Sequence, residues 1–142
     1  MTEALHLVDV NVLIARVFQT HEHHRLAVEW LNTPGLQWAL SPWTEAGFLR
    51  FATAPNRLTM GEASGLLDDL EQMPGYHYHP ISHNWRTLTR PFFRRLHGHN
   101  QVTDAYLLGM AIHDGLKLAT FDKRILHVAG EHSHCVHIVG AK

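Results

Sequence analysis

The sequence predicts a three-layer α/β/α sandwich, in which helices cover both faces of a mainly parallel sheet of about five strands. Short apolar segments of strand length alternate along the chain with longer segments in which apolar residues recur at helical spacing. Strands separated by helices favour right-handed crossovers and parallel pairing. The chain has 142 residues, 45% of them hydrophobic, and shows no repeat or linker, so residues 1–142 are expected to form a single domain.

Turn residues and helix start and stop signals divide the first half of the chain. Pro42 suits the first turn of a helix, and Pro74 and Gly75 end the amphipathic stripe that begins at Met60. These signals predict strands at 5–8, 38–40 and 76–81, and helices at 12–18, 22–31, 42–52 and 60–70.

The second half holds the most apolar helix expected in the chain, which spans residues 101–113 and is closed by Gly115. Residues 84–96 are helical in composition, but Pro91 removes a backbone hydrogen bond, so two short helices are expected there. The last elements are expected to be strands at 116–120 and 135–139, on either side of a brief helix at 123–128.

Four carboxylates stand inside or beside apolar segments, where an unpaired charge is costly. They are Asp9 in LVDVNVLIA, Glu45 in WTEAGFLRF, Asp104 in VTDAYLLGMA and Asp122 in LATFDKRIL. Three of them follow expected strands, at the sheet edge where open α/β sheets bind ligands, and Asp104 opens the most apolar helix. Carboxylates suit Mg²⁺ or Mn²⁺, which also bind phosphate oxygens, so the pattern predicts a phosphoryl-transfer site.

Other interpretations of these acids exist. Each acid taken alone can be an ordinary helix-start or loop residue, favoured in the case of Asp104 and Asp122 by a helix dipole. The chain lacks the glycine-rich loops of nucleotide-binding proteins. A haloacid-dehalogenase phosphatase needs a second Asp two residues after the first, where this chain has Asn11. A receiver domain needs paired acids near the first strand and an Asp after the third, and residues 79–83 contain none.

The segments LVDVNVLIA, SPWTEAGFLR, QVTDAYLLGMAIHDG and LATFDKRI resemble, in order and spacing, the successive motifs of PIN-domain ribonucleases, and most closely the VapC-type toxins of type II toxin–antitoxin pairs. The resemblance spans almost the whole chain and implies a PIN-like domain that cleaves RNA with Mg²⁺, or Mn²⁺ in its place. It implies catalytic and metal-binding roles for Asp9, Glu45, Asp104 and Asp122, and RNA products with 5′-phosphate ends. We expect Asp9 and Asp104 to bind metal directly, and the other two to complete the cluster through a second ion or through waters.

The resemblance also implies partners. Family members are usually homodimers and are held inactive by a small cognate antitoxin, so contact with DNA is expected only indirectly, through the antitoxin. A competing hypothesis keeps the fold but makes the chain a catalytically silent partner that acts with an antitoxin in autoregulation. The single Cys135, the lack of a leader-like N-terminus and the lack of a membrane-length apolar segment predict a cytoplasmic protein.

Of three polar residues near the acids, two have two interpretations each. Asn11 and Thr120 can donate hydrogen bonds that orient carboxylates, or serve as a helix cap and an ordinary strand residue. Thr103 is best explained as a helix cap beside Asp104.

Charge and basic residues give weaker signals. The chain has 12 Lys and Arg against 13 Asp and Glu, a formal charge of -1 that alone suggests no nucleic-acid partner. A basic ridge of four arginines can contact RNA phosphates, or it can be a solvated helix face. The ridge consists of Arg86, Arg90, Arg94 and Arg95.

Histidine is unusually frequent, at 14 residues. The cluster HSHCVH at 132–137, interpreted as a strand, places His132 and His134 on one face and Cys135 and His137 on the other, and its spacing matches no known zinc motif. His97 and His99 precede Asp104, so they are either near the substrate or ordinary surface histidines.

Overall fold

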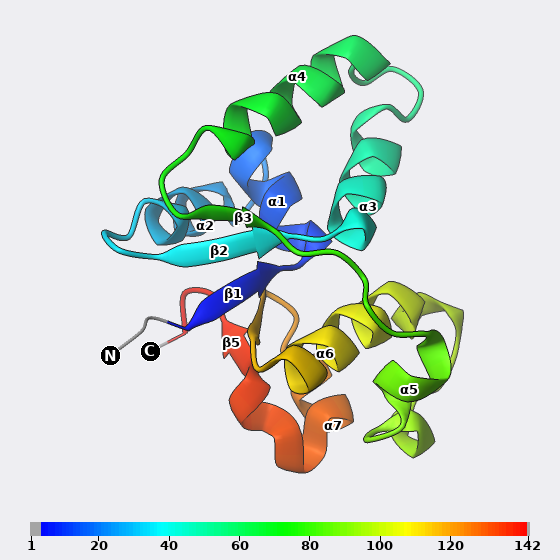
Figure 1. The fold of residues 1–142 in the computed structure, drawn as a ribbon. Helices are drawn as coiled ribbons and strands as arrows, with labels where there is room; N and C mark the ends of the chain where they lie inside the picture. Colours follow the sequence, from blue (N-terminus) through cyan, green and yellow to red (C-terminus); the bar gives the residue numbers. More distant parts are fainter. Residues whose placement is uncertain (1–3, 142) are drawn as a thin grey trace.

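The computed structural model describes residues 4–141 and shows five parallel strands between two layers of helices (Figure 1). The strand order is β3-β2-β1-β4-β5, and every neighbouring pair is parallel, so the predicted fold class is confirmed. The strands are β1 (Leu5–Val8), β2 (Gln37–Leu40), β3 (Tyr76–Tyr78), β4 (Lys117–Thr120) and β5 (Val136–Ile138).

The helices cover the two faces of the sheet separately (Figure 1). The first face carries α1 (Val10–Val17), α2 (His24–Leu31), α3 (Pro42–Ala52) and α4 (Met60–Glu71). The second face carries α5 (Trp85–Thr89), α6 (Val102–Asp114) and α7 (Ile125–Ala129). None of the helices among residues 4–141 is long and apolar enough to span a membrane.

Two hydrophobic cores result from the alternation of side chains along the central strands. Leu7 and Leu118 pack into the core around α6, whereas their neighbours Val8 and Ala119 pack into the core around α1. Successive strand residues point to opposite faces, and both faces of a parallel sheet are covered by helices. This explains why β1 and β4 each contain two consecutive buried apolar residues, Leu7–Val8 and Leu118–Ala119.

Most predicted elements are present, with shifted ends. The first helix begins at Val10, two residues earlier than expected, because Asp9 acts as its N-cap. The third strand ends at Tyr78, before Pro80, which has no N–H to donate to a strand ladder. The region around Pro91 is divided as predicted, into α5 and a short 3-10 helix at Phe93–Arg95.

The strand interpretation of HSHCVH is wrong for its first four residues. Residues Gly130–Cys135 form a 3-10 helix, and strand pairing begins only where Val136 lies opposite Leu118. Gly130, with a φ of 54°, ends α7 and redirects the chain into this turn. The predicted division of the cluster between two strand faces therefore does not exist.

Candidate active site

Asp9 and Asp122 meet at the carboxyl ends of two adjacent strands. β1 pairs with β4 in parallel, and the Asp9 N–H donates to the Ala119 carbonyl oxygen at 2.9 Å. The chain leaves β1 toward β2 on one side and reaches β4 on the other, so this edge is a topological switch point. Ligands of open α/β sheets bind at such a point.

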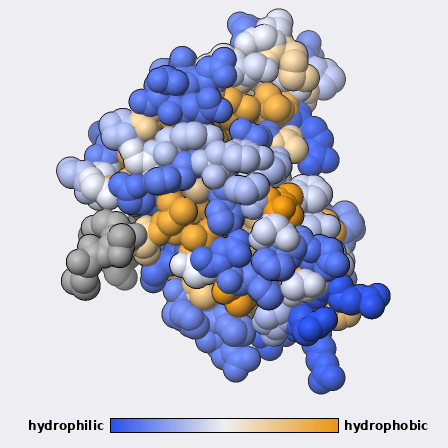
Figure 2. All heavy atoms as spheres, in the orientation of Figure 1, coloured by the Kyte–Doolittle hydropathy of each residue, from blue (hydrophilic) through white to orange (hydrophobic). Residues whose placement is uncertain are grey.

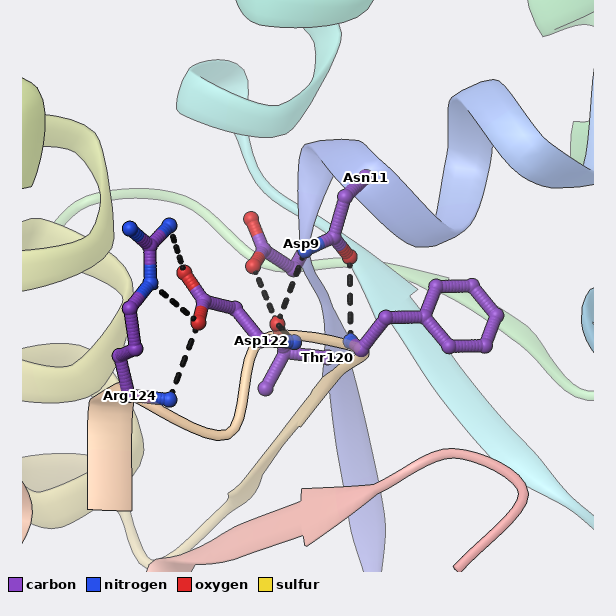
Figure 3. Close-up of polar contacts among 6 residues, drawn as sticks. Asp9, Asn11, Thr120, Asp122 and Arg124 are labelled. Carbon is purple, nitrogen blue, oxygen red and sulfur yellow. Dashed lines mark hydrogen bonds and ion pairs between the residues drawn. The ribbon is translucent and has the colours of Figure 1, made fainter. Parts of the chain in front are cut away.

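Thr120 connects the residues at this edge (Figure 3). Its hydroxyl donates to Asp9 Oδ2 at 2.6 Å and accepts from Asn11 Nδ2 and from the Asp122 N–H, both at 3.1 Å. Thr120 is 1% exposed, so these bonds are shielded from water. The predicted hydrogen bond from Thr120 to a carboxylate is present.

Asn11 acts one step further from the carboxylates than predicted. It donates to Thr120, and its Oδ1 accepts from the Phe121 N–H at 3.3 Å. Its alternative role as the helix cap is wrong because Asp9 occupies that position. Asn11 therefore holds Thr120 and the start of the loop after β4, and Thr120 in turn bonds to Asp9 and Asp122.

Asp9 is buried, with 4% of its surface exposed, and has like charges as neighbours. Burial, followed by the nearby charge of Asp104, raises the pKa of Asp9 to about 7. The hydrogen bonds from Thr120 and from the Val10 N–H act in the opposite direction, and they do not cancel this effect. The site therefore favours a neutral Asp9 unless a cation compensates its charge.

Asp104 lies in the first turn of α6 and is subject to the same forces. Burial, followed by the charge of Asp122, raises its pKa, and Arg124 only partly offsets this shift. The predicted cap role of Thr103 is wrong, because α6 begins at Val102 and Gln101 occupies the N-cap position. Thr103 instead borders the same cavity as Asp9 and Asp104.

Asp122 has a cation of its own (Figure 3). Arg124 Nε donates to Asp122 Oδ1 and Arg124 Nη2 donates to Oδ2, each at 2.9 Å. These bonds from Arg124 lower the pKa of the Asp122 carboxyl. Asp122 Oδ1 also accepts from the Arg124 N–H at 3.0 Å, in the turn that leads into α7.

Glu45 is the one predicted acid that the structure does not bring to this cluster. Burial, followed by the charge of Glu71 at the end of α4, raises its pKa. On α3, Gly47 and Arg50 face the cavity that Asp9 borders. Glu45 precedes Gly47 by two residues, which is a rotation of about 200° around the helix, so Glu45 lies on a different face. Among residues 4–141, no three His, Cys, Asp or Glu side chains are grouped so that they could hold a metal ion.

Two cavities lie along the acidic edge, and Asp104 borders both. The larger, about 350 Å³, is lined by Asp9, Val10, Asn11, Ile14, Gly47, Arg50, Thr103 and Asp104. The smaller, about 100 Å³, is lined by Asn100, Gln101, Asp104, Asp122, Arg124, Ile125 and Val128. Asp104 thus borders one cavity together with Asp9 and the other together with Asp122.

Arg50 is a residue of this site that the sequence analysis missed. It lies on the same helix as Glu45 and places a positive charge on the wall of the cavity with Asp9 and Asp104. The signal available in the sequence is its spacing of three from Gly47, which puts both on one helix face. A Cβ on Gly47 would meet Val10 Cγ2 at 2.6 Å, so the glycine allows α3 to approach the start of α1.

The chemistry of the donors fits a hard divalent cation. Asp9 and Asp104 border the same cavity, and burial, followed by the charge of a neighbouring acid, raises the pKa of each carboxyl. Oxygen ligands are those that Mg²⁺ and Mn²⁺ prefer, and a bound cation removes the repulsion between like charges.

Comparison with known proteins defines the class and then the family. A family model described as PIN domain matches residues 6–131, so this fold with its acidic edge is that of a PIN-domain protein. Ribonuclease VapC38 of Mycobacterium tuberculosis is 34% identical over 128 residues, which cover 87% of this chain and 89% of the relative. Ribonuclease VapC29 of the same species is 32% identical over 126 residues, which cover 88% and 91%. The chain belongs to the VapC-type toxins of the PIN-domain family.

Solved structures show the same fold at lower identity. A toxin–antitoxin complex from Klebsiella pneumoniae aligns with a TM-score of 0.57 at 20% identity, covering 92% of this chain and 94% of that chain. The crystal structure of Mycobacterium tuberculosis VapC20, described as a sarcin-ricin loop cleaving toxin, aligns with a TM-score of 0.61 at 10% identity, covering 79% and 85%.

Proposed function

We propose that this chain is a Mg²⁺- or Mn²⁺-dependent endoribonuclease and the toxin of a toxin–antitoxin pair, which hydrolyses RNA phosphodiesters at the acidic edge of β1 and β4. The observation that carries this proposal is the buried Asp9, whose pKa is raised to about 7 beside Asp104 and which has no cationic partner of its own. Relatives named ribonucleases support the class of activity.

The roles of the residues follow from their contacts. Asp9 and Asp104 would hold the cation, and a bound Mg²⁺ or Mn²⁺ would supply an activated water and neutralise charge on the attacked phosphate. Thr120 fixes the Asp9 carboxylate in one orientation through its 2.6 Å hydrogen bond. Arg50 lies on the cavity wall, where its guanidinium can face a phosphate oxygen.

Asp122 and Glu45 complete the proposed site less directly. Asp122 borders the smaller cavity with Asp104, so it can hold a water or a second ion there. Glu45 lies on the same helix as Arg50, but it is partly buried and is repelled by the like charge of Glu71. We assign it a role through bound water, or after a rotation of its side chain toward the cavity.

We infer an antitoxin partner that covers the acidic edge with a basic side chain, and contact with DNA only through that antitoxin. The support is the net negative edge formed by Asp9 and Asp104, together with similarity to solved structures that are toxin–antitoxin complexes. One such structure is described as VapBC2 from Rickettsia felis bound to a DNA fragment from their promoter. A homodimer completes the proposed assembly.

The deciding experiment is an RNA cleavage assay with purified wild type, Asp9→Asn and Asp104→Asn in EDTA, Mg²⁺ or Mn²⁺. We expect wild type to cleave only with a divalent cation and to leave 5′-phosphate ends, and both variants to be at least about a hundredfold slower. Asp68→Asn, an exposed acid of α4, is the matched control and should retain activity.

Sequencing of cellular RNA 5′ ends after brief expression of wild type and of Asp9→Asn then identifies the substrate. Cleavage in EDTA that leaves 2′,3′-cyclic phosphates would contradict the proposed mechanism. A wild type that binds its antitoxin and cleaves no RNA with either metal would favour the catalytically silent partner.

A further inference from the structure

The stretch between Glu71 and Asp104 contains no Asp or Glu, although the whole chain has a formal charge of -1. It contains four arginines, at Arg86, Arg90, Arg94 and Arg95. The near-neutral total therefore conceals a segment that carries positive charge only. Clustered positive charge on one part of a surface is what a polyanion recognises.

Three of these arginines surround one surface cavity. The cavity has a volume of about 610 Å³ and is lined by Trp85, Arg86, Thr89, Arg90, Phe93 and Arg94. Within residues 4–141, none of the ion pairs involves Arg86, Arg90 or Arg94, and all three are exposed. Figure 2 shows strongly hydrophilic side chains projecting over the region where Figure 1 places α5.

The fourth arginine serves a different purpose. Arg95 Nε donates to the Val128 carbonyl oxygen at 2.8 Å, and Arg95 Nη2 donates to the Ala129 carbonyl oxygen at 3.4 Å. These carbonyls belong to the last turn of α7. Arg95 is thus part of the fold, and the basic surface consists of the other three.

Aromatic side chains line the same cavity. Phe93 is 58% exposed, which is unusual for so large an apolar side chain, and Trp85 forms another part of the wall. Exposed aromatic rings beside arginines form the pattern by which proteins bind single-stranded nucleic acid, because bases stack on the rings while guanidiniums contact phosphates.

The cavity lies next to α6, the helix that carries Asp104 at its start. A Cβ on Gly109 of α6 would meet the Leu88 carbonyl oxygen of α5 at 2.6 Å, so the two helices are in close contact. The Trp85 ring lies 5.0 Å from that of Tyr106, which is two residues past Asp104. In Figure 1, α5 lies on the side toward which β1 and β2 point, and Asp9 directly follows β1.

We propose that this surface, formed by Trp85, Arg86, Arg90, Phe93 and Arg94, binds the single-stranded part of the RNA substrate that flanks the scissile phosphate. The proposal rests on the proposed ribonuclease function for the identity of the nucleic acid. The arginines contact successive phosphates, and Phe93 and Trp85 stack on bases. The acidic edge repels phosphates unless a cation is bound, so a separate basic surface provides the attraction that brings RNA to it.

The test measures binding of a fluorescent single-stranded RNA of about 16 nucleotides at several salt concentrations. All variants carry Asp9→Asn, so that no RNA is cleaved. The triple change Arg86→Gln, Arg90→Gln and Arg94→Gln should weaken binding by about tenfold or more and flatten the log–log salt slope by about 2. Phe93→Ala should weaken binding by about fivefold or more and leave the slope unchanged.

Two controls separate this surface from general charge. Arg25→Gln removes an exposed arginine of α2 and should not change RNA binding. Polyglutamate serves as an acidic polypeptide probe, and Phe93→Ala should not affect its binding. The proposal is overturned if the triple variant keeps the salt slope of the Asp9→Asn parent with RNA, or if the arginines matter for polyglutamate and not for RNA.

The outcomes also separate this inference from the proposed function. Wild type that cleaves RNA, together with a triple variant that binds RNA normally, rejects the surface and leaves the nuclease intact. If wild type cleaves no RNA with either metal and the triple variant loses RNA binding, the surface is supported and the nuclease is rejected. Thermal unfolding of each variant checks that the fold is retained.

Discussion

Asp9 and Asp122 follow neighbouring strands and share the hydroxyl of Thr120, yet their surroundings are opposite. Asp9 is buried beside Asp104, and its pKa is raised to about 7. Asp122 is bound by Arg124, which lowers its pKa. Two acids at one sheet edge can therefore differ in what they require: Asp9 needs a cation from solution, whereas Asp122 already has one.

The largest effect expected from this difference is on stability in the absence of divalent cations. The folded-state pKa of Asp9, about 7, lies above its ordinary value of 3.8, so the folded chain retains a proton that the unfolded chain releases between these values. Stability conferred by the protonated form is fully present below pH 3.8 and is lost progressively as the pH rises to about 7, on the order of 4 kcal/mol in total.

Urea unfolding in EDTA at about pH 5 and about pH 8 measures the part of this loss that falls above pH 5, about 3 kcal/mol. Asp9→Asn should remove most of it, Asp68→Asn should not, and Mg²⁺ should restore wild-type stability at the higher pH. Equal stability of wild type at both pH values would show that Asp9 is not destabilised as described.

The next effect concerns the hydroxyl that links the two acids. Thr120→Val removes the 2.6 Å bond to Asp9, so the pKa of Asp9 should rise further. We expect Mg²⁺-dependent cleavage to fall by about 10- to 100-fold and the free energy of unfolding to fall by about 1–3 kcal/mol. Thr53→Val is the control, because it loses a 2.6 Å bond to the Leu49 carbonyl oxygen away from the site. Equal cleavage by the two variants would remove Thr120 from the proposed site.

A substitution of Glu45 tests whether the fourth acid contributes to the site as strongly as Asp9 does. Because Glu45 does not border the cavity with Asp9, Glu45→Gln should lower cleavage by only about tenfold, a smaller loss than that of Asp9→Asn. Glu71→Gln should leave cleavage unchanged. A loss in Glu45→Gln as large as that in Asp9→Asn would show that Glu45 turns into the cavity when metal binds.

The smallest effect is expected at the exposed ion pair. The Arg124 side chain is 92% exposed, so Arg124→Gln should leave the thermal midpoint nearly unchanged. The pKa of Asp122 should return toward its usual value, and its freed carboxylate should lower the Mg²⁺ concentration for half-maximal cleavage by about threefold. Lys123→Gln is the control, and an unchanged Mg²⁺ requirement in Arg124→Gln would show that Asp122 takes no part in metal binding.

The sequence was sufficient to predict the order of strands and helices along the chain, the helix layers, and the positions of Asp9 and Asp122 at one edge, whereas the site role of Asp104 was implied by the family resemblance. These follow from local signals, namely apolar periodicity and the rule that parallel strands place their carboxyl ends together. The break near Pro91 was predictable for the same reason, because proline acts on its own helix.

The orientation of Glu45 was not predictable, since it depends on contacts between distant segments. Thr44 donates to the Val8 carbonyl oxygen at 2.7 Å, and Gly47 lies against Val10, and together they set the rotation of α3. The 3-10 helix before β5 was missed because HSHCVH alternates like a strand, whereas its first part follows the turn at Gly130. Contacts between segments far apart in the sequence thus determine both the orientation of Glu45 and the conformation of residues 130–135.

Of the four arginines in this segment, one supports the fold and three lie on the surface, and this affects which substitutions the protein can tolerate. Arg95 anchors the last turn of α7, whereas Arg86, Arg90 and Arg94 make no ion pair within residues 4–141. Mutations at the latter three positions alter the chemistry of the surface and leave the hydrogen bonds that anchor α7 intact. Substitutions at Arg86, Arg90 and Arg94, in evolution or in protein engineering, can therefore change the binding properties of this surface with little effect on folding, provided that Arg95 is kept.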